Sequence, residues 1–107
     1  MNHVSATELA AWLADSSRAQ PFLLDVRENW EVETCKIAGS TQIAMQTVPA
    51  RIDDLDDDAE IVCICHHGAR SMQVAAFLER HGFARVTNLT GGIHAWAVQV
   101  DNTMPQY

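Results

Sequence analysis

Apolar and polar positions follow two different periods along this chain. Ser5-Ala6-Thr7-Glu8 has the form of a capping box, and Leu9, Trp12 and Leu13 follow it at helical spacing. This pattern predicts a first helix from about Ala6 to Ala14, with Trp12 in the core. Short runs rich in apolar and β-branched residues, bounded by turn residues, recur further along the chain and predict buried strands.

The expected elements alternate in type. Strands are predicted at Phe22–Arg27, Thr41–Ala44, Ile61–Cys65 and Arg85–Leu89. Helical segments are predicted at Glu28–Glu33, from about Thr47 with Val48, Ile52 and Leu55 on one face, at Met72–Leu78, and at Ile93–Val98. Such alternation predicts an α/β domain with a mainly parallel sheet and helices on both faces. We expect residues 1–107 to form this one domain.

The loop after the third predicted strand holds the residues best suited to chemistry. It begins at Cys65, continues as His66-His67-Gly68-Ala69 and ends at Arg70-Ser71, next to a predicted helix. A helix N-terminus offers backbone N–H groups without partners and partial positive charge, so it binds anions. These groups and the Arg70 guanidinium, brought round the sulfur, favour the thiolate, which is the nucleophilic form of cysteine. The pattern therefore predicts a reactive thiol at Cys65.

Four other features have simpler interpretations. Cys63 is interpreted as a buried structural residue, because free cysteine often behaves as a small hydrophobe. Asp25 is interpreted as a local partner that holds the loop after its strand, and Trp96 as a core residue. The acidic residues between Asp53 and Glu60 lack the ligand order of an EF-hand, so they predict a solvated acidic face.

Composition narrows the range of partners. The chain has 107 residues, of which 48% are hydrophobic, as expected for a folded domain. Seven basic and fourteen acidic residues give a net charge of −7, which argues against nucleic acid or an anionic membrane as a partner but allows a small anionic ligand. The three cysteines lack disulfide-framework spacing, and no signal peptide or membrane-spanning run is evident. We therefore expect a cytoplasmic protein.

Three motifs resemble those of single-domain rhodaneses, a family of sulfurtransferases. They are Leu24-Asp25-Val26-Arg27-Glu28, the loop Cys65–Ser71, and Gly91-Gly92-Ile93-His94-Ala95-Trp96. The loop is the most specific of the three, and the resemblance covers nearly the whole chain. Family members often have Gly-His-Ile-Pro-Gly-Ala where this chain has Cys35-Lys36-Ile37-Ala38-Gly39-Ser40, so any role of that histidine is absent here.

The resemblance implies a sulfurtransferase in which Cys65 carries sulfur as a persulfide. The loop residues His66, His67, Gly68, Ala69, Arg70 and Ser71 would bind a small anionic sulfur donor such as thiosulfate. A thiol, a protein cysteine or cyanide would accept the sulfur, and neither a cofactor nor a metal is implied. Whether the two histidines add positive charge, set the polarity of the loop or simply face solvent stays open.

The sequence also allows three alternative functions. Cysteine phosphatases place five residues between cysteine and arginine, whereas Cys65 and Arg70 enclose four, a tighter loop that suits sulfane sulfur better. A metal site formed by Cys63, Cys65, His66 and His67 lacks the paired spacing of zinc sites. The third alternative is a rhodanese-fold module that carries sulfur, senses oxidants through its cysteine or binds a protein, with little turnover.

Overall fold

The computed structural model describes residues 1–107 and is built on a five-stranded sheet in which every neighbouring pair of strands is parallel. The strands lie in the order β1-β5-β4-β2-β3. Their bounds are Asn2–Val4 (β1), Phe22–Asp25 (β2), Thr41–Gln42 (β3), Ile61–Ile64 (β4) and Val86–Leu89 (β5). All four residues of β4 are buried, as expected for a central strand covered on both faces.

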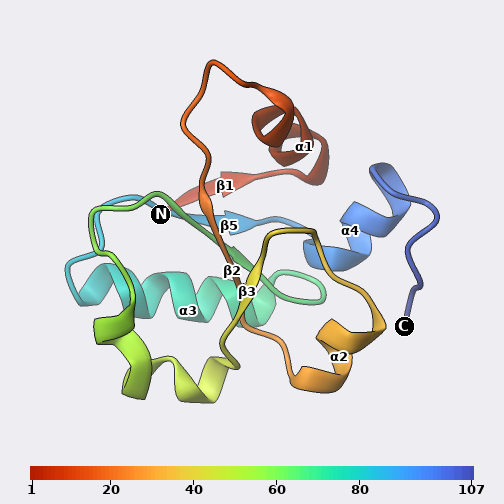
Figure 1. The fold of residues 1–107 in the computed structure, drawn as a ribbon. Coiled ribbons are helices and arrows are strands. Elements are labelled where there is room, and N and C mark those ends of the chain that lie inside the picture. Colours follow the sequence, from red (N-terminus) through yellow and green to blue (C-terminus); the bar gives the residue numbers. More distant parts are fainter.

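Helices cover both faces of this sheet (Figure 1). One face carries the helix α3, which follows β4, and two short 3-10 helices; the other carries α1 and α4. A sixth helical segment, α2, follows β2. The bounds are Ala6–Ala14 (α1), Asn29–Thr34 (α2), Met45–Thr47 (η1), Pro49–Asp54 (η2), Ala69–Arg80 (α3) and Gly92–Gln99 (α4). The observed architecture confirms the predicted fold class.

Each face of the sheet has its own apolar core. On one face, Val74 and Leu78 of α3 pack among residues that include Cys63 and Cys65. On the other, Trp12 of α1 and Trp96 of α4 pack on the alternate positions of β4, which confirms both tryptophans as core residues. Because successive residues of a strand point to opposite faces, one central strand supports both cores.

Local sequence signals placed most helices correctly. Ser5 and Glu8 form the predicted capping box, and α1 has the predicted bounds. The segment near Thr47 differs from the expected helix, because it forms the 3-10 helices η1 and η2, with Pro49 in the first turn of the second. The strand β1 was not predicted. It is three residues long at the sheet edge, and its pairing with β5 is invisible in local periodicity.

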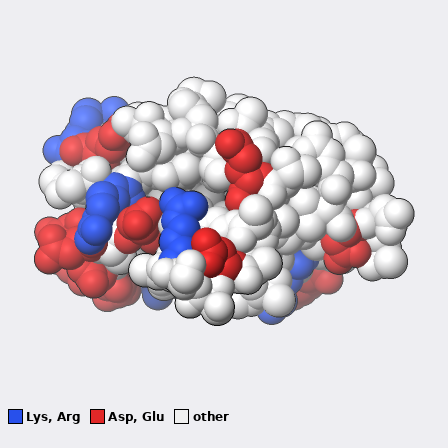
Figure 2. All heavy atoms as spheres, turned by 90° about the horizontal axis from the view of Figure 1, so that it is seen from above, with Lys and Arg blue, Asp and Glu red and all other residues white.

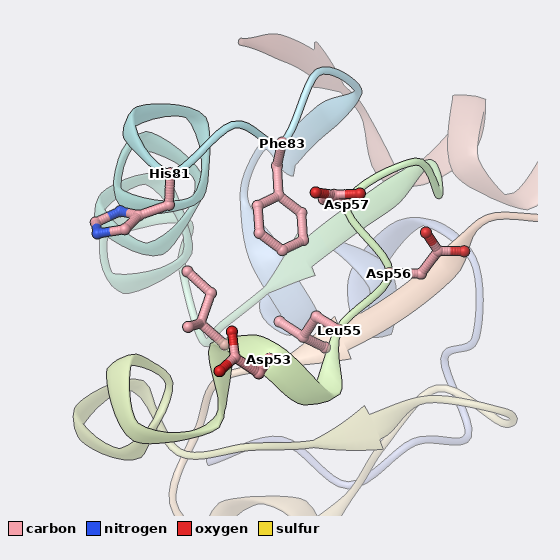
Figure 3. Close-up of a pocket in the computed structure, with 7 residues that line it drawn as sticks. Asp53, Leu55, Asp56, Asp57, His81 and Phe83 are labelled. Atoms are coloured by element: carbon pink, nitrogen blue, oxygen red, sulfur yellow. The ribbon is translucent and has the colours of Figure 1, made fainter.

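Charged residues lie mainly on the surface. Figure 2 shows acidic and basic side chains interspersed at one end of one face, with much of the remaining area uncharged. The predicted acidic face is confirmed: Asp53, Asp56 and Asp57 are exposed and line a hollow with His81 and Phe83 (Figure 3). No helix has the length and apolar character needed to cross a membrane.

Candidate active site

The Cys65 loop lies at the carboxyl edge of the sheet, directly after the central strand β4. Ligand sites of open α/β sheets are found at this edge. The loop is short, because β4 ends at Ile64 and α3 begins at Ala69. Gly68 precedes the helix with a φ of +110°, a left-handed conformation that residues with a Cβ rarely adopt. The strand, the turn and the helix together hold Cys65 in one place.

The Cys65 sulfur is enclosed by polar groups. The backbone N–H of Gly68 donates to Sγ at 3.0 Å, and the Ser71 hydroxyl lies 3.2 Å from Sγ. The Ser71 hydroxyl also lies 2.5 Å from Oδ1 of Asn88, which comes from the neighbouring strand β5. Cys63 has no such surroundings: burial raises the pKa of its thiol to about 12, and its side chain lies in the core as predicted. The two cysteines therefore have different environments.

Several amides of the loop are free to bind a ligand. The backbone N–H groups of His66 and His67 donate to no protein acceptor, and the same holds for the first helical residues, Ala69 to Ser71. Two carbonyl groups of the loop are occupied by α4: Ile93 N–H donates to Cys65 O at 2.8 Å, and His94 N–H donates to His66 O at 3.0 Å. The loop thus presents unpaired donors, the arrangement found in anion-binding turns.

The Arg70 guanidinium has a carboxylate partner that the sequence did not predict. It forms a two-pronged ion pair with Glu31 of α2, at 2.6 and 2.7 Å. Glu31 is buried, whereas the Arg70 side chain is 32% exposed. A carboxylate held at this position gives the guanidinium a better partner than the sulfur does. Arg70 therefore stands at the rim of the loop with one edge accessible.

A second arginine, Arg27, is linked to Glu31 through hydrogen bonds. Arg27 and Asp25 form an ion pair at 2.7 Å with both side chains fully buried, which confirms the prediction that Asp25 is a local partner. Arg27 also donates to the hydroxyl of Tyr107 at 3.0 Å, and that hydroxyl donates to Glu31 at 2.7 Å. A continuous network thus runs from the buried pair to Arg70.

The loop histidines lie against the end of the chain. The His66 ring stacks on Tyr107 with a centroid distance of 4.0 Å, and His67 is exposed beside it. Burial, with a smaller contribution from His67, lowers the pKa of His66, so this ring is neutral near pH 7. A standing positive charge on His66 is therefore disfavoured.

Sequence reasoning missed three residues that build the site. Glu31 lies in an acidic predicted helix in which no feature sets it apart, and Tyr107 lies in a tail without periodicity. The pattern around Asn88 predicts an ordinary strand residue. Only the position of Asn88 at the carboxyl end of a predicted strand could have drawn attention to it. The contacts of Glu31 and Tyr107 depend on the fold.

The Glu31–Arg70 pair gives a prediction for the pH dependence of stability. The Arg70 hydrogen bonds hold the pKa of Glu31 at about 2, below its ordinary value of 4.5. Because the lower pKa belongs to the folded state, this contribution is complete above about pH 4.5 and is lost as the pH falls toward 2. Glu31→Gln should therefore lower the free energy of unfolding by on the order of 2–3 kcal/mol at neutral pH.

Denaturant unfolding across this pH range checks the prediction. The difference between wild type and Glu31→Gln should shrink steadily as the pH falls from about 5 to 2. Glu33→Gln, on the exposed side of the same helix, is the matched control and should change stability little. A difference that stays constant over the whole range would contradict the ion-pair explanation.

Comparisons with known proteins agree with this geometry. The family model of the rhodanese-like domain matches residues 5–99. The chain is 36% identical over 97 residues to a sulfurtransferase of Allochromatium vinosum, covering 91% of this chain and 89% of that protein. It is 38% identical over 74 residues to the putative sulfur carrier protein YrkF of Bacillus subtilis, covering 69% and 40%.

A solved structure of a rhodanese-like protein has the same fold. The rhodanese-like domain protein from Staphylococcus aureus matches with a TM-score of 0.85 at 27% identity, covering 100% of this chain and 99% of that one. The parallel sheet, the cysteine loop at its carboxyl edge and the sequence matches all point the same way. The chain belongs to the rhodanese-like family, among sulfurtransferases and sulfur carriers, as the motif resemblance indicated.

Proposed function

We propose that this protein is a thiosulfate-type sulfurtransferase in which Cys65 carries the transferred sulfur as a persulfide. The observation that carries the proposal is the environment of the Cys65 sulfur, which accepts from the Gly68 amide at 3.0 Å inside a loop with several unpaired N–H groups. Such donors stabilise negative charge on a sulfur and on an anionic donor. The substrate-binding residues would be His66, His67, Gly68, Ala69, Arg70 and Ser71.

In the first step, the Cys65 thiolate attacks the outer sulfur of thiosulfate. A new S–S bond forms while the S–S bond of thiosulfate breaks, and its electron pair leaves with sulfite. The free amides of the loop would bind the donor, and the exposed edge of Arg70 would attract it to the rim. Glu31 would act on Arg70 as a positioning residue, since it fixes the guanidinium through two hydrogen bonds.

In the second step, an acceptor removes the outer sulfur. A thiolate, a protein cysteine or cyanide attacks it, the bond to Sγ breaks, and Cys65 leaves with the electron pair as a thiolate. The Gly68 amide would stabilise that leaving group. Splitting the transfer into two displacements on one cysteine is covalent catalysis.

A sulfur carrier or protein-binding module is the second candidate. It is favoured by the enclosure of Cys65, whose residue is only 1% exposed, and by the likeness to a protein named as a putative sulfur carrier. An enclosed persulfide would persist until a suitable partner reached it. Such a module would load sulfur readily but turn over slowly with small acceptors.

Steady-state kinetics separate the two candidates. With thiosulfate and cyanide varied in turn, the enzyme should give parallel double-reciprocal lines, as expected when sulfite leaves before cyanide reacts. The carrier should load one sulfur per chain and then release it to cyanide no faster than a free persulfide would. Intersecting lines would contradict the persulfide route, because they require both substrates to be bound together.

A further inference from the structure

Three of the five histidines gather beside the Cys65 loop. His66 and His67 come from the loop itself, and His94 comes from the first turns of α4. The ring centroid of His67 lies 3.9 Å from that of His66 and 5.1 Å from that of His94. One ring nitrogen of each residue falls within 4.8 Å of the other two. No cysteine sulfur and no carboxylate belongs to this group.

The backbone that carries the three rings is fixed. α4 begins directly against the loop, where His94 N–H donates to His66 O and Ile93 N–H donates to Cys65 O. At Gly92, a Cβ would lie 2.4 to 2.6 Å from backbone atoms of Cys65 and His66, so the two segments touch closely. The closeness of the rings therefore follows from backbone packing and does not depend on surface side chains meeting by chance.

The rings themselves keep the freedom that metal binding requires. His67 and His94 are exposed, and His66 is half-buried. Zinc–nitrogen bonds of about 2.0–2.1 Å place two ligand nitrogens roughly 3.3 Å apart in a tetrahedral site, so closing the group takes movements of about 1.5 Å or less. Rotation about the side-chain torsions of two exposed histidines covers that distance.

The type of ligand also suits a transition metal. The imidazole ring of histidine binds a metal ion in its neutral form, through a ring nitrogen. The stacking of His66 on Tyr107 uses the face of the ring, whereas a metal binds to a nitrogen lone pair in the ring plane. An all-nitrogen ligand set favours zinc, copper or nickel over calcium and magnesium, which require oxygen ligands.

We propose that His66, His67 and His94 form a binding site for a divalent transition-metal ion, at the mouth of the Cys65 loop. Three imidazoles leave at least one coordination position open for water or an external ligand, as in zinc sites with three protein ligands. The bound ion would join the loop to α4. The site shares His66 and His67 with the proposed donor-binding loop, but Cys65, which would carry the sulfur, is not among its ligands.

Calorimetric titration with Zn²⁺ alone tests this proposal. The protein would carry Cys65→Ser, so that zinc binding to the loop thiol cannot contribute and sulfur uptake is not involved. We expect one zinc ion per chain and an affinity at least about tenfold weaker after His94→Gln. His81→Gln is the matched control, because His81 is exposed at the far end of α3, outside the cluster, and its loss should leave zinc affinity unchanged.

Nuclear magnetic resonance of the imidazole nitrogens identifies the ligands independently. One nitrogen of each of the three rings should shift on addition of one equivalent of Zn²⁺, while those of His3 and His81 stay in place. Either no saturable zinc uptake or undiminished affinity in both His94→Gln and His67→Gln would overturn the metal site. Neither result would touch the proposed sulfur transfer, which depends on Cys65.

Discussion

Replacing Arg27 by methionine should lower the free energy of unfolding by about 3–5 kcal/mol, because the substitution leaves the carboxylate of Asp25 buried without its partner. Both side chains of the pair are fully buried, and their ion pair is 2.7 Å long. Arg27 also donates to the carbonyls of Glu31 and Cys35, at 3.2 and 2.7 Å, and these acceptors would lose their partners too.

The matched control is a surface pair of the same chemistry. Arg51 and Asp54 form an ion pair at 3.1 Å with more than half of each side chain exposed. Arg51→Met should therefore change stability by less than about 1 kcal/mol. Denaturant unfolding at neutral pH measures both variants. Equal losses for Arg27→Met and Arg51→Met would show that the buried network contributes no more than a solvent-exposed pair.

Gly92→Ala should damage both the fold and the site. A Cβ at this position would lie 2.4 Å from Cys65 O and 2.5 Å from His66 O, and Gly92 has a φ of +59°. Overpacking costs about 1–3 kcal/mol and a left-handed conformation about 1–2 kcal/mol, so we expect a combined loss of about 2–5 kcal/mol. Because the clash is with loop backbone, the Gly68 amide and the Cys65 sulfur should also move apart.

Gly82→Ala separates the cost of the left-handed conformation from the cost of overpacking. Gly82 has a φ of +91°, but nothing lies within 4 Å of a Cβ built there. This variant should lose only the conformational cost of about 1–2 kcal/mol and keep full reactivity of Cys65 toward iodoacetamide. The same measurements on Gly92→Ala should give the larger loss of stability and an altered rate of alkylation. A Gly92→Ala protein as stable and reactive as Gly82→Ala would contradict the close contact of α4 with the loop.

Local patterns predicted most of the elements, since capping, periodicity and apolar runs are properties of neighbouring residues. α1 has the expected bounds because Ser5 and Glu8 form a complete capping box. The order of strands in the sheet and the edge strand β1 depend on pairings between distant segments. The 3-10 helices near Pro49 show the same limit, because an apolar face at helical spacing is also compatible with the tighter helix.

Of the candidate site, only the Cys65 loop could be predicted from the sequence. A strand, a cysteine, a glycine turn and a helix occur in sequence order, so the Cys65 loop could be located without the fold. The partner of Arg70 is Glu31 of α2, a helix that precedes β4 in the sequence, whereas Arg70 follows β4. His94 contacts the loop from α4. No spacing rule connects such residues, because the contact of α2 with Arg70 and that of α4 with the loop form only in the folded chain.

Intact mass spectrometry after incubation with thiosulfate tests the central claim most directly. The reduced protein should gain the mass of one sulfur atom, Cys65→Ser should gain none, and Cys35→Ser, which removes another buried thiol, should gain one. Added cyanide should return the loaded protein to its original mass. No gain in the wild type while Cys65 stays free, or an equal gain in Cys65→Ser, would contradict sulfur transfer from thiosulfate through Cys65.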